Sequence, residues 1–331
     1  MKKLKLLTGV ITGVLLLEVT IRLVSPVIGP TQTSWQIQQQ AKVIKLRERP
    51  IRLGTIDLIV MGDSTGKEGI DPDVLDSSMA IGSQSFNASL NSSTTYTIMK
   101  QASEILQSSK PKLLLVMIGP GTFRDSDDDK SVQAYDQGAT VEVSSGINGF
   151  LNRNSYLYRY RNSIRDPFIL NTFYRAIRYR SLREGIVYRN VDTMKFNGDS
   201  SFPRTLNSYT SGKYDLPTSE PFLQITSYPA ATVRHLQVLE AECKKIGANL
   251  ILSTVPTITY NPKYRALVGS LAQRVGVEFI QGNNATTELG DFSDGVHLNA
   301  VGARKLSEYV GSELRTIFMK REGFRLFLIR N

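Results

Sequence analysis

The chain has 331 residues, of which 41% are hydrophobic and 21% charged, and its net charge is +10. This composition excludes a disordered protein, and the length allows one large α/β domain with an insertion or two small domains. The lone Cys243 excludes an intramolecular disulfide. Because the sequence also has no Cys/His cluster of the zinc type, we expect neither a metal nor another cofactor.

The N-terminal segment has the design of an export signal. Three lysines precede a charge-free apolar run over residues 6–17, and Glu18 and Arg22 follow one helical turn apart. Counting this pair, the segment reaches about 20 residues, the length of a membrane span. We find no small-residue cleavage site, so residues 1–30 are predicted to form a signal anchor that keeps the rest of the chain on the extracytoplasmic side, in the periplasm or at the cell surface. The alternative is a buried amphipathic helix.

Residues 31–52 are rich in glutamine and then basic, and they include Trp35. Such a polar segment suits a juxtamembrane linker with an aromatic residue at the interface. A single catalytic domain is then predicted over residues 53–331.

Short apolar runs alternate with helical patterns along this domain, which predicts a three-layer α/β/α sandwich around a mainly parallel sheet. Functional groups are expected in loops at the carboxyl ends of the strands. Cys243 falls on an apolar helical stripe and is interpreted as a core residue, and Asn299 is predicted to cap the last helix. The first strand is expected to begin at Ile56, and the later strands to cover residues 84–90, 112–118, 249–254 and 277–280. The expected helices cover residues 94–108, 231–246, 263–274 and 300–318.

The alternation breaks over about residues 120–222, which are predicted to form an insertion. Arg and Tyr alternate densely over residues 156–189, and an acidic run covers 124–130. A basic and aromatic stretch could stack on bases, rest on an anionic bilayer or bind a polyanionic glycan. Solvated helices with the aromatic side chains inward are the favoured interpretation, and the export segment argues against nucleic acid as a partner.

Nucleophilic acyl transfer needs a hydroxyl or thiol, a base and an acid that orients the base. The chain has two histidines. His235 lies in a predicted helix without a nearby acid, whereas His297 follows Asp294 by three residues on a loop before the last helix. Ser64 follows the first predicted strand in the sequence Met-Gly-Asp-Ser. These three residues form a candidate triad, and Asp63 is interpreted as a structural ligand of the loop.

The order of these motifs resembles the SGNH/GDSL hydrolase superfamily. Its first motif supplies the serine nucleophile and its last the aspartate and histidine, so the resemblance implies that Ser64, Asp294 and His297 are catalytic. It also implies a flavodoxin-like α/β/α fold over about residues 56–318. The two middle motifs depart from the pattern, because Ser89 and Gly121 stand where the family has a glycine and an asparagine that line the oxyanion hole.

The loss of a side-chain donor at Gly121 typically costs a factor of about 10² to 10³ in rate. The backbone at Ser64 and Ser89 and the side chains of Asn87, Asn91 or Thr122 are the predicted substitutes.

The expected activity is hydrolysis or transfer of an O-acyl group, most simply acetyl, from an acylated carbohydrate or another small ester. The chain resembles membrane-tethered SGNH proteins associated with cell-surface polysaccharide, with the membrane contact made by the N-terminal helix. The alternative is a catalytically weak scaffold that binds polysaccharide or assists envelope assembly. The two differ in whether Ser64 reacts.

Overall fold

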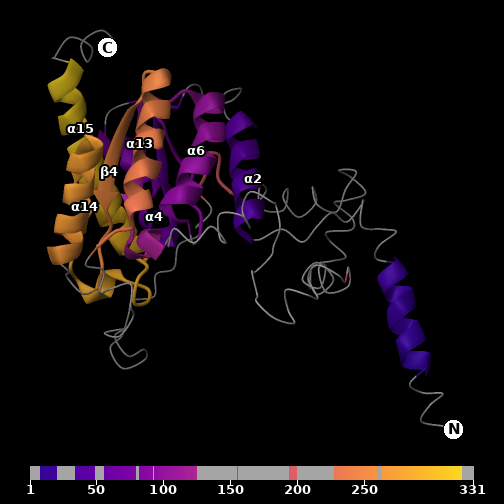
Figure 1. Ribbon diagram of the computed structural model, residues 1–331. Helices are drawn as coiled ribbons and strands as arrows, with labels where there is room; N and C mark the ends of the chain where they lie inside the picture. The colour runs from indigo at the N-terminus through magenta and orange to yellow at the C-terminus, as the bar shows by residue number, and fades with distance from the viewer. Residues whose placement is uncertain are drawn as a thin grey trace. The chain divides into compact units, whose positions relative to one another are not determined.

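The computed structural model in Figure 1 describes residues 8–20, 34–48, 56–79, 82–91, 93–124, 155, 194–199, 227–258 and 262–322. The chain divides into two compact units, one of residues 1–41 with 128–192 and one of residues 42–127 with 193–331. In the first unit, residues 8–20 are helical. Within the described ranges, no helix is both long and apolar enough to cross a membrane.

The second unit is built on a five-stranded parallel sheet in the order β2-β1-β3-β4-β5. Every residue of β1 and β3 is buried, because helices cover both faces of the sheet. Such strands have nearly continuous apolar sequences, as the sequence predicted. The strand order reverses direction between β1 and β3, and ligands of open α/β sheets bind at this kind of switch point. The strands are β1 (Leu58–Gly62), β2 (Ser85–Asn87), β3 (Leu113–Ile118), β4 (Asn249–Thr254) and β5 (Glu278–Ile280).

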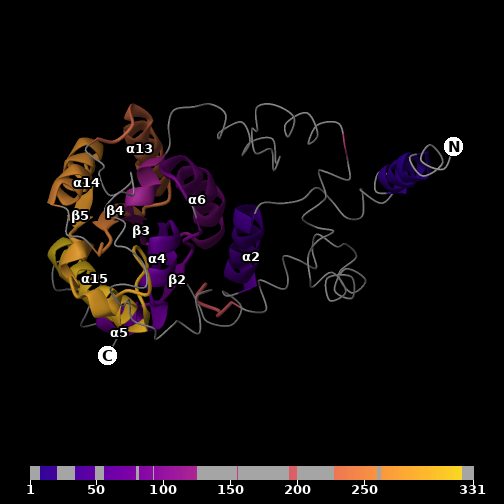
Figure 2. The ribbon, with the colours of Figure 1, turned by 90° about the horizontal axis from the view of Figure 1, so that it is seen from below.

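Two hydrophobic cores lie on opposite faces of the sheet, so the predicted α/β/α sandwich is confirmed (Figure 2). One core packs α6 (Thr95–Ser109), α13 (Ala230–Lys245) and α14 (Pro262–Val275) against the strands. The other packs α5 (Pro72–Met79) and α15 (Ala300–Glu322). The short elements are α4 (Ser64–Gly69), η1 (Pro120–Arg124), η3 (Gly282–Asn284) and η4 (Leu289–Asp291).

Helix termini and core residues follow the predicted chemistry. The Thr94 hydroxyl accepts from the backbone N–H of Thr97, closing a capping box at the start of α6. The Asn299 side chain accepts from the backbone N–H groups of Val301 and Gly302, at 2.9 and 3.1 Å, and so caps α15 as predicted. Cys243 is fully buried, which confirms its interpretation as a core residue.

Residues 31–52 correct the prediction of a linker. They contain helix α2 (Ser34–Glu48), and from Lys42 onward this helix belongs to the second unit. Val43 and Leu46 pack into its core. Lys42 itself is fully buried. A lysine at a buried position interrupts the apolar stripe by which an amphipathic helix is recognised, so the pattern concealed the helix.

The described strands β1, β2 and β3 precede the predicted insertion, and β4 and β5 follow it. The Arg- and Tyr-rich residues 156–189, and the acidic run from residue 125, lie outside the described residues. Residues 194–199 are described and lie along the edge of β2, where the backbone N–H of Asn87 donates to the carbonyl oxygen of Asn197 at 2.9 Å.

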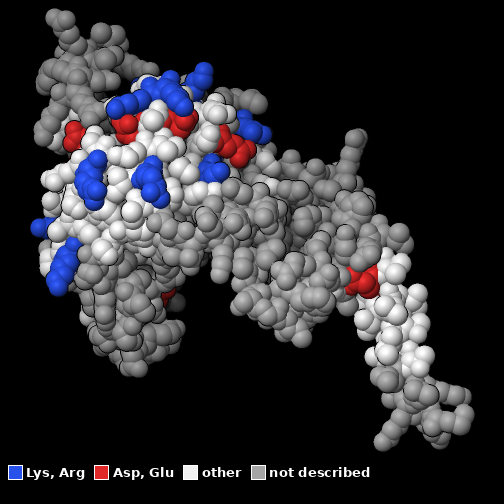
Figure 3. Space-filling model, in the orientation of Figure 1, with Lys and Arg blue, Asp and Glu red and all other residues white. Residues whose placement is uncertain are grey.

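Charged side chains gather at the upper end of the face in Figure 3, where basic residues stand beside acidic ones. Ion pairs at the C-terminal end of α13 join Lys244 to Glu240 and Lys245 to Glu242, at 2.6 and 2.5 Å. Part of the positive charge is therefore compensated locally, which is the usual state of a solvated helix surface.

Candidate active site

The turn after β1 presents Ser64 as the first residue of α4. Asp63 caps this helix, because its Oδ1 accepts from the backbone N–H of Thr65 at 2.9 Å and from the Thr65 hydroxyl at 2.5 Å. The first N–H groups of a helix have no partner four residues earlier in the chain. Since Asp63 takes the one from Thr65, the backbone N–H of Ser64 is left as a donor beside its own hydroxyl.

A tight loop before α15 presents Asp294 and His297. An antiparallel bridge between Phe292 and Leu298 closes the loop, and the backbone N–H of Ser293 donates to the carbonyl oxygen of His297 at 2.9 Å. Asp294 Oδ1 accepts from the backbone N–H groups of Val296 and His297 at 2.8 and 2.7 Å. This turn fixes the carboxylate from within its own loop, and its second oxygen remains for the histidine ring.

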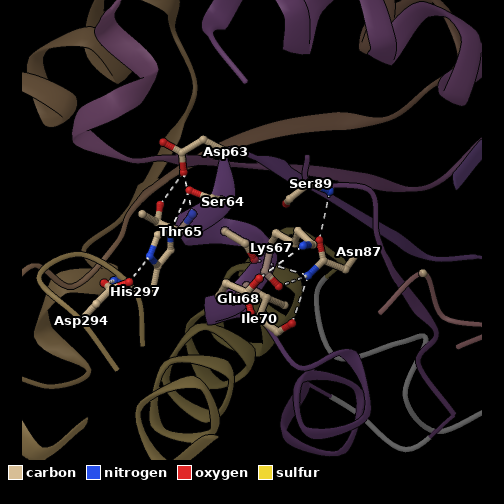
Figure 4. Close-up of polar contacts among 12 residues, drawn as sticks. Asp63, Ser64, Thr65, Lys67, Glu68, Ile70, Asn87, Ser89, Asp294 and His297 are labelled. Atoms are coloured by element: carbon tan, nitrogen blue, oxygen red, sulfur yellow. Dashed lines mark hydrogen bonds and ion pairs between the residues drawn. The ribbon is translucent and has the colours of Figure 1, made fainter. Parts of the chain in front are cut away.

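The three predicted catalytic residues meet in one hydrogen-bonded row (Figure 4). His297 Nε2 lies 2.8 Å from Ser64 Oγ, and His297 Nδ1 lies 2.8 Å from Asp294 Oδ2. With Nδ1–H donated to the carboxylate, Nε2 is left to accept the serine proton. The arrangement has the order and the distances of a nucleophile, a general base and an orienting acid.

Electrostatics at the triad favour an ionised Asp294. Burial alone would raise its pKa, but hydrogen bonds from the His297 ring and from the backbone of Val296 and His297 outweigh burial and lower the pKa to about 2. For His297, burial alone would lower the pKa, but the hydrogen bond and the negative charge of Asp294 raise it above the ordinary 6.5. The carboxylate therefore stabilises the imidazolium that forms when the base takes a proton.

Asp63 joins the nucleophile turn to the loop after β3. Its Oδ2 accepts from the Thr122 hydroxyl at 3.3 Å, and the Thr122 hydroxyl accepts from the backbone N–H of Gly119 at 2.9 Å. A Cβ at Gly119 would lie 2.7 Å from the carboxylate, so glycine is required there. Burial raises the pKa of Asp63 despite the bonds from Thr65 and Thr122. The interpretation of Asp63 as a structural ligand is confirmed.

On the other side of Ser64, two of the predicted oxyanion donors are already committed. The Asn87 amide donates to the carbonyl oxygens of Ile70, Gly66 and Lys67, at 3.0, 3.3 and 3.3 Å. Thr122 donates to Asp63, as described above. Neither side chain is free for a substrate oxygen, which corrects the prediction for both. The reason is that each supports the framework on which the nucleophile stands.

The remaining predicted donors differ in availability. The Ser89 backbone N–H donates to Asn87 Oδ1 at 3.0 Å, and its buried hydroxyl has no partner in the described structure. Gly121 has no side-chain donor, and a Cβ there would lie 3.2 Å from Asp63 Oδ2. Asn91 is half-buried in the loop after β2, and no hydrogen bond of its side chain is found among the described residues. Among the predicted donors, the backbone N–H of Ser64 and the side chain of Asn91 are therefore the ones without another hydrogen bond within the described residues.

The motif analysis missed Lys67 and Glu68, which follow Ser64 by three and four residues on α4. This spacing places them on the same helix face as the nucleophile. Their side chains form an ion pair of 3.3 Å, and the charge of Glu68 contributes to the raised pKa of His297. The helical spacing was the available signal.

His235, the other histidine, lies on α13, where its Nδ1 is 3.1 Å from the Thr95 hydroxyl. The structure therefore does not bring it to Ser64. No group of three or more acidic, histidine or cysteine side chains that could hold a metal occurs in the described ranges.

Comparison with known proteins gives similarities of fold. The chain matches no protein-family model and no curated protein. Similar solved structures include a proposed acylhydrolase from Bacteroides fragilis NCTC 9343, at 12% identity and a TM-score of 0.39, covering 84% of this chain and 97% of the other. The protein TesA has 13% identity and a TM-score of 0.39, with 78% and 98% covered. A catalytic mutant of Axe2, an acetylxylan esterase from Geobacillus stearothermophilus, has 14% identity and a TM-score of 0.36, with 81% and 94% covered.

The resemblance to the SGNH/GDSL hydrolase superfamily therefore rests on the first and last sequence motifs, at Ser64 and at Asp294 and His297. At these identities the similarity concerns the fold alone. What the site does chemically has to be argued from its own side chains.

Proposed function

We propose that this protein is a serine-dependent acyl-ester hydrolase or acyltransferase with Ser64 as nucleophile, His297 as general base and Asp294 as orienting acid. The carrying observation is the unbroken row from Ser64 Oγ through the His297 ring to Asp294, with 2.8 Å at each contact. Two segments of the chain far apart in sequence converge to build this row. A purely structural serine and histidine would not need the aspartate to be fixed in position as well.

In the proposed reaction, His297 Nε2 takes the proton from Ser64 Oγ while the oxygen attacks the ester carbonyl carbon. The electron pair of the carbonyl moves onto its oxygen, and the backbone N–H of Ser64 is the proposed donor that stabilises the resulting negative charge. When the intermediate collapses, the alcohol leaves with the proton from His297, and an acyl-serine remains. Attack by water gives hydrolysis and attack by a sugar hydroxyl gives transfer, with His297 again taking the proton.

The test is covalent labelling of the full chain with a fluorophosphonate probe, which reacts with activated serines. We expect the wild-type protein to be labelled and Ser64→Ala to be unlabelled. Ser253→Ala is a matched control, because Ser253 is a buried serine on β4. Labelling that survives in Ser64→Ala would rule out this nucleophile.

A binding scaffold is the second candidate function. It is favoured by the oxyanion side of the site, where Gly121 has no side chain and the side chains of Asn87 and Thr122 are committed elsewhere. Under this alternative, the protein binds an acylated glycan without turning it over. Two results together would support the scaffold. The wild-type protein is not labelled, and the wild type and Ser64→Ala bind acetylated polysaccharide with equal affinity.

We further propose that the acyl group is acetyl, that the carrier is envelope polysaccharide, and that the site faces the extracytoplasmic side. These proposals rest on the resemblance to membrane-tethered SGNH proteins and on the apolar N-terminal segment. Acetate release from acetylated oligosaccharide, compared with release of a longer acyl chain, tests the substrate. A reporter fused to the C-terminus tests the location, and a cytoplasmic signal would contradict it.

A further inference from the structure

Three separate segments of the chain meet at Asn87. The hydrogen bonds of this residue go to backbone groups and not to the side chains of the triad. The three segments are helix α2 through Lys42, residues 194–199 of the insertion through Gly198, and α4 through its backbone carbonyl groups. We refer to Lys42, Asn87 and Gly198 as the Asn87 junction. Lys42 and Asn87 are fully buried.

Lys42 joins two of these segments. Its ammonium donates to the carbonyl oxygen of Asn87 and, at 2.6 Å, to the carbonyl oxygen of Gly198. A buried ammonium must be compensated by hydrogen bonds, so these contacts are costly to lose. Apolar side chains such as Val43 and Leu46 could hold α2 on the core without a buried charge. We therefore interpret Lys42 as a residue that fixes the position of α2 by directional hydrogen bonds.

Gly198 is fitted to the same place. Its φ of +77° favours glycine, and an added Cβ would lie 2.6 Å from the Asn87 carbonyl oxygen and 2.7 Å from the Phe86 ring. The backbone N–H of Asn87 also donates to Asn197 in this segment. Residues 194–199 are therefore linked to Asn87 in two ways, by the direct backbone hydrogen bond from Asn87 to Asn197 and by Lys42, which donates to both Asn87 and Gly198.

Asn87 connects these segments to the helix that begins with the nucleophile. Its amide holds the carbonyl oxygens of Gly66, Lys67 and Ile70, which belong to α4 and its C-terminal cap (Figure 4). Ser64 begins α4, and its hydroxyl must stay within hydrogen-bond reach of His297. A displacement of about 1 Å in such a site can cost a factor of about 10² in rate.

We propose that Lys42 is a positioning residue of the active site: through the Asn87 junction, α2 and residues 194–199 of the insertion hold α4 in place and so fix the position of Ser64. This proposal rests on the proposed function. Lys42, Asn87 and Gly198 all belong to the same compact unit as the triad, so the support reaches the nucleophile from within that unit.

The test compares three variants of the full chain, Lys42→Met, Gly198→Ala and the control Leu46→Ala. Leu46 is buried one turn further along α2 and has an apolar side chain that packs into the hydrophobic core. Ester turnover and the rate of fluorophosphonate labelling are measured per folded protein, and amide hydrogen exchange is followed over residues 63–70.

We expect Lys42→Met to lower kcat and the labelling rate by about 10² with little change in KM, and to speed exchange in α4. Gly198→Ala should act in the same direction. Leu46→Ala should lower the Tm but leave labelling and α4 exchange near wild type. The proposal is overturned if Lys42→Met leaves both unchanged, or if Leu46→Ala has the same effects.

Two further outcomes are decided by the other variant and by the exchange measurement. If Lys42→Met does not fold, Gly198→Ala decides the matter against the same control. If the wild-type protein is not labelled at all, the proposed function fails, and the α4 exchange alone decides whether the Asn87 junction positions the helix.

Discussion

The two sides of Ser64 are built differently. On one side, Asp294 and His297 lie in a single short loop whose own backbone holds the carboxylate, and both face the serine. On the other side, Asn87 ends β2 and Thr122 lies in η1 after β3, and their side chains form hydrogen bonds to the backbone of α4 and its cap and to Asp63. The proton-transfer side is complete, whereas the side that stabilises negative charge depends on the backbone and on few side chains.

Under the proposed function, this difference indicates which side of the site limits the reaction rate. A general base contributes typically 10² to 10⁴, and the loss of one oxyanion donor costs about 10² to 10³. Because the proposed base and its acid are within hydrogen-bond distance, we expect the departure at Gly121 to slow the proposed reaction rather than to abolish it. The following predictions test the two sides separately, beginning with the largest effect.

The largest effect should come from the proton-transfer side. Ser64→Ala or His297→Ala should each reduce turnover of an aryl acetate by roughly 10⁴ or more, and the double variant should be little worse, because triad residues act as a unit. His235→Ala is the matched control and should keep wild-type turnover, since His235 lies on α13 and forms its hydrogen bond with Thr95 of α6. Additive losses in the double variant would contradict a shared role.

Asp294→Asn should cost roughly 10³ to 10⁴ in kcat, because the amide no longer holds the histidine tautomer and its charged form. The fall should be no larger than that of Ser64→Ala. Glu288→Gln is the control, since Glu288 is an exposed acid near the same loop that pairs with Lys305 at 3.0 Å. Equal, small losses in both variants would show that Asp294 has no special role.

On the charge-stabilising side, Asn91→Ala should lower kcat by about 10² if the side chain donates to the oxyanion, with KM little changed. Asn284→Ala changes an exposed asparagine in η3 and should have no effect. If Asn91→Ala keeps full turnover, the backbone of Ser64 supplies the stabilisation without it.

The pH dependence should follow His297. The neutral ring is the base, so kcat/KM should rise with pH, pass its midpoint above 6.5 because Asp294 raises the pKa, and then level off. In Asp294→Asn the midpoint should move down. A midpoint at or below 6.5 in the wild type would contradict the geometry.

The same groups affect stability in opposite pH windows. The raised pKa of His297 contributes stability that is present below pH 6.5 and lost as the pH rises through the folded-state value. The lowered pKa of Asp294 contributes stability that is present above 3.8 and lost as the pH falls toward 2. Urea unfolding at several pH values in the wild type and in Asp294→Asn measures both.

Much of the fold was predictable because buried parallel strands have a distinctive sequence. β3 and β4 were recognised from uninterrupted apolar runs, and the triad from the position of its motifs at the two ends of the domain. β2 was expected to be longer than its observed Ser85–Asn87. Its three residues pair with β1, and the backbone N–H groups of Ala88 and Leu90 still donate to the carbonyl oxygens of Val60 and Gly62 beyond the end of the strand, at 2.7 and 3.0 Å.

The failures have a common physical cause. Asn87 and Thr122 carry donors at the right places along the chain, but their partners are backbone and carboxylate groups that become neighbours only in the folded state. α2 was missed because Lys42 finds its carbonyl acceptors 45 and 156 residues away. Local periodicity cannot show bonds of this range.

The hydrogen bond between Ser64 and His297 spans 233 residues of chain. A contact this distant in sequence forms slowly, because a long loop must close before the bond can repay the lost entropy. During synthesis, Ser64 emerges long before its base and remains an ordinary hydroxyl until the last loop is in place. If Ser64 is the nucleophile as proposed, activity requires that the loop of Asp294 and His297 has been synthesised and folded, and a product truncated before this loop should be inactive.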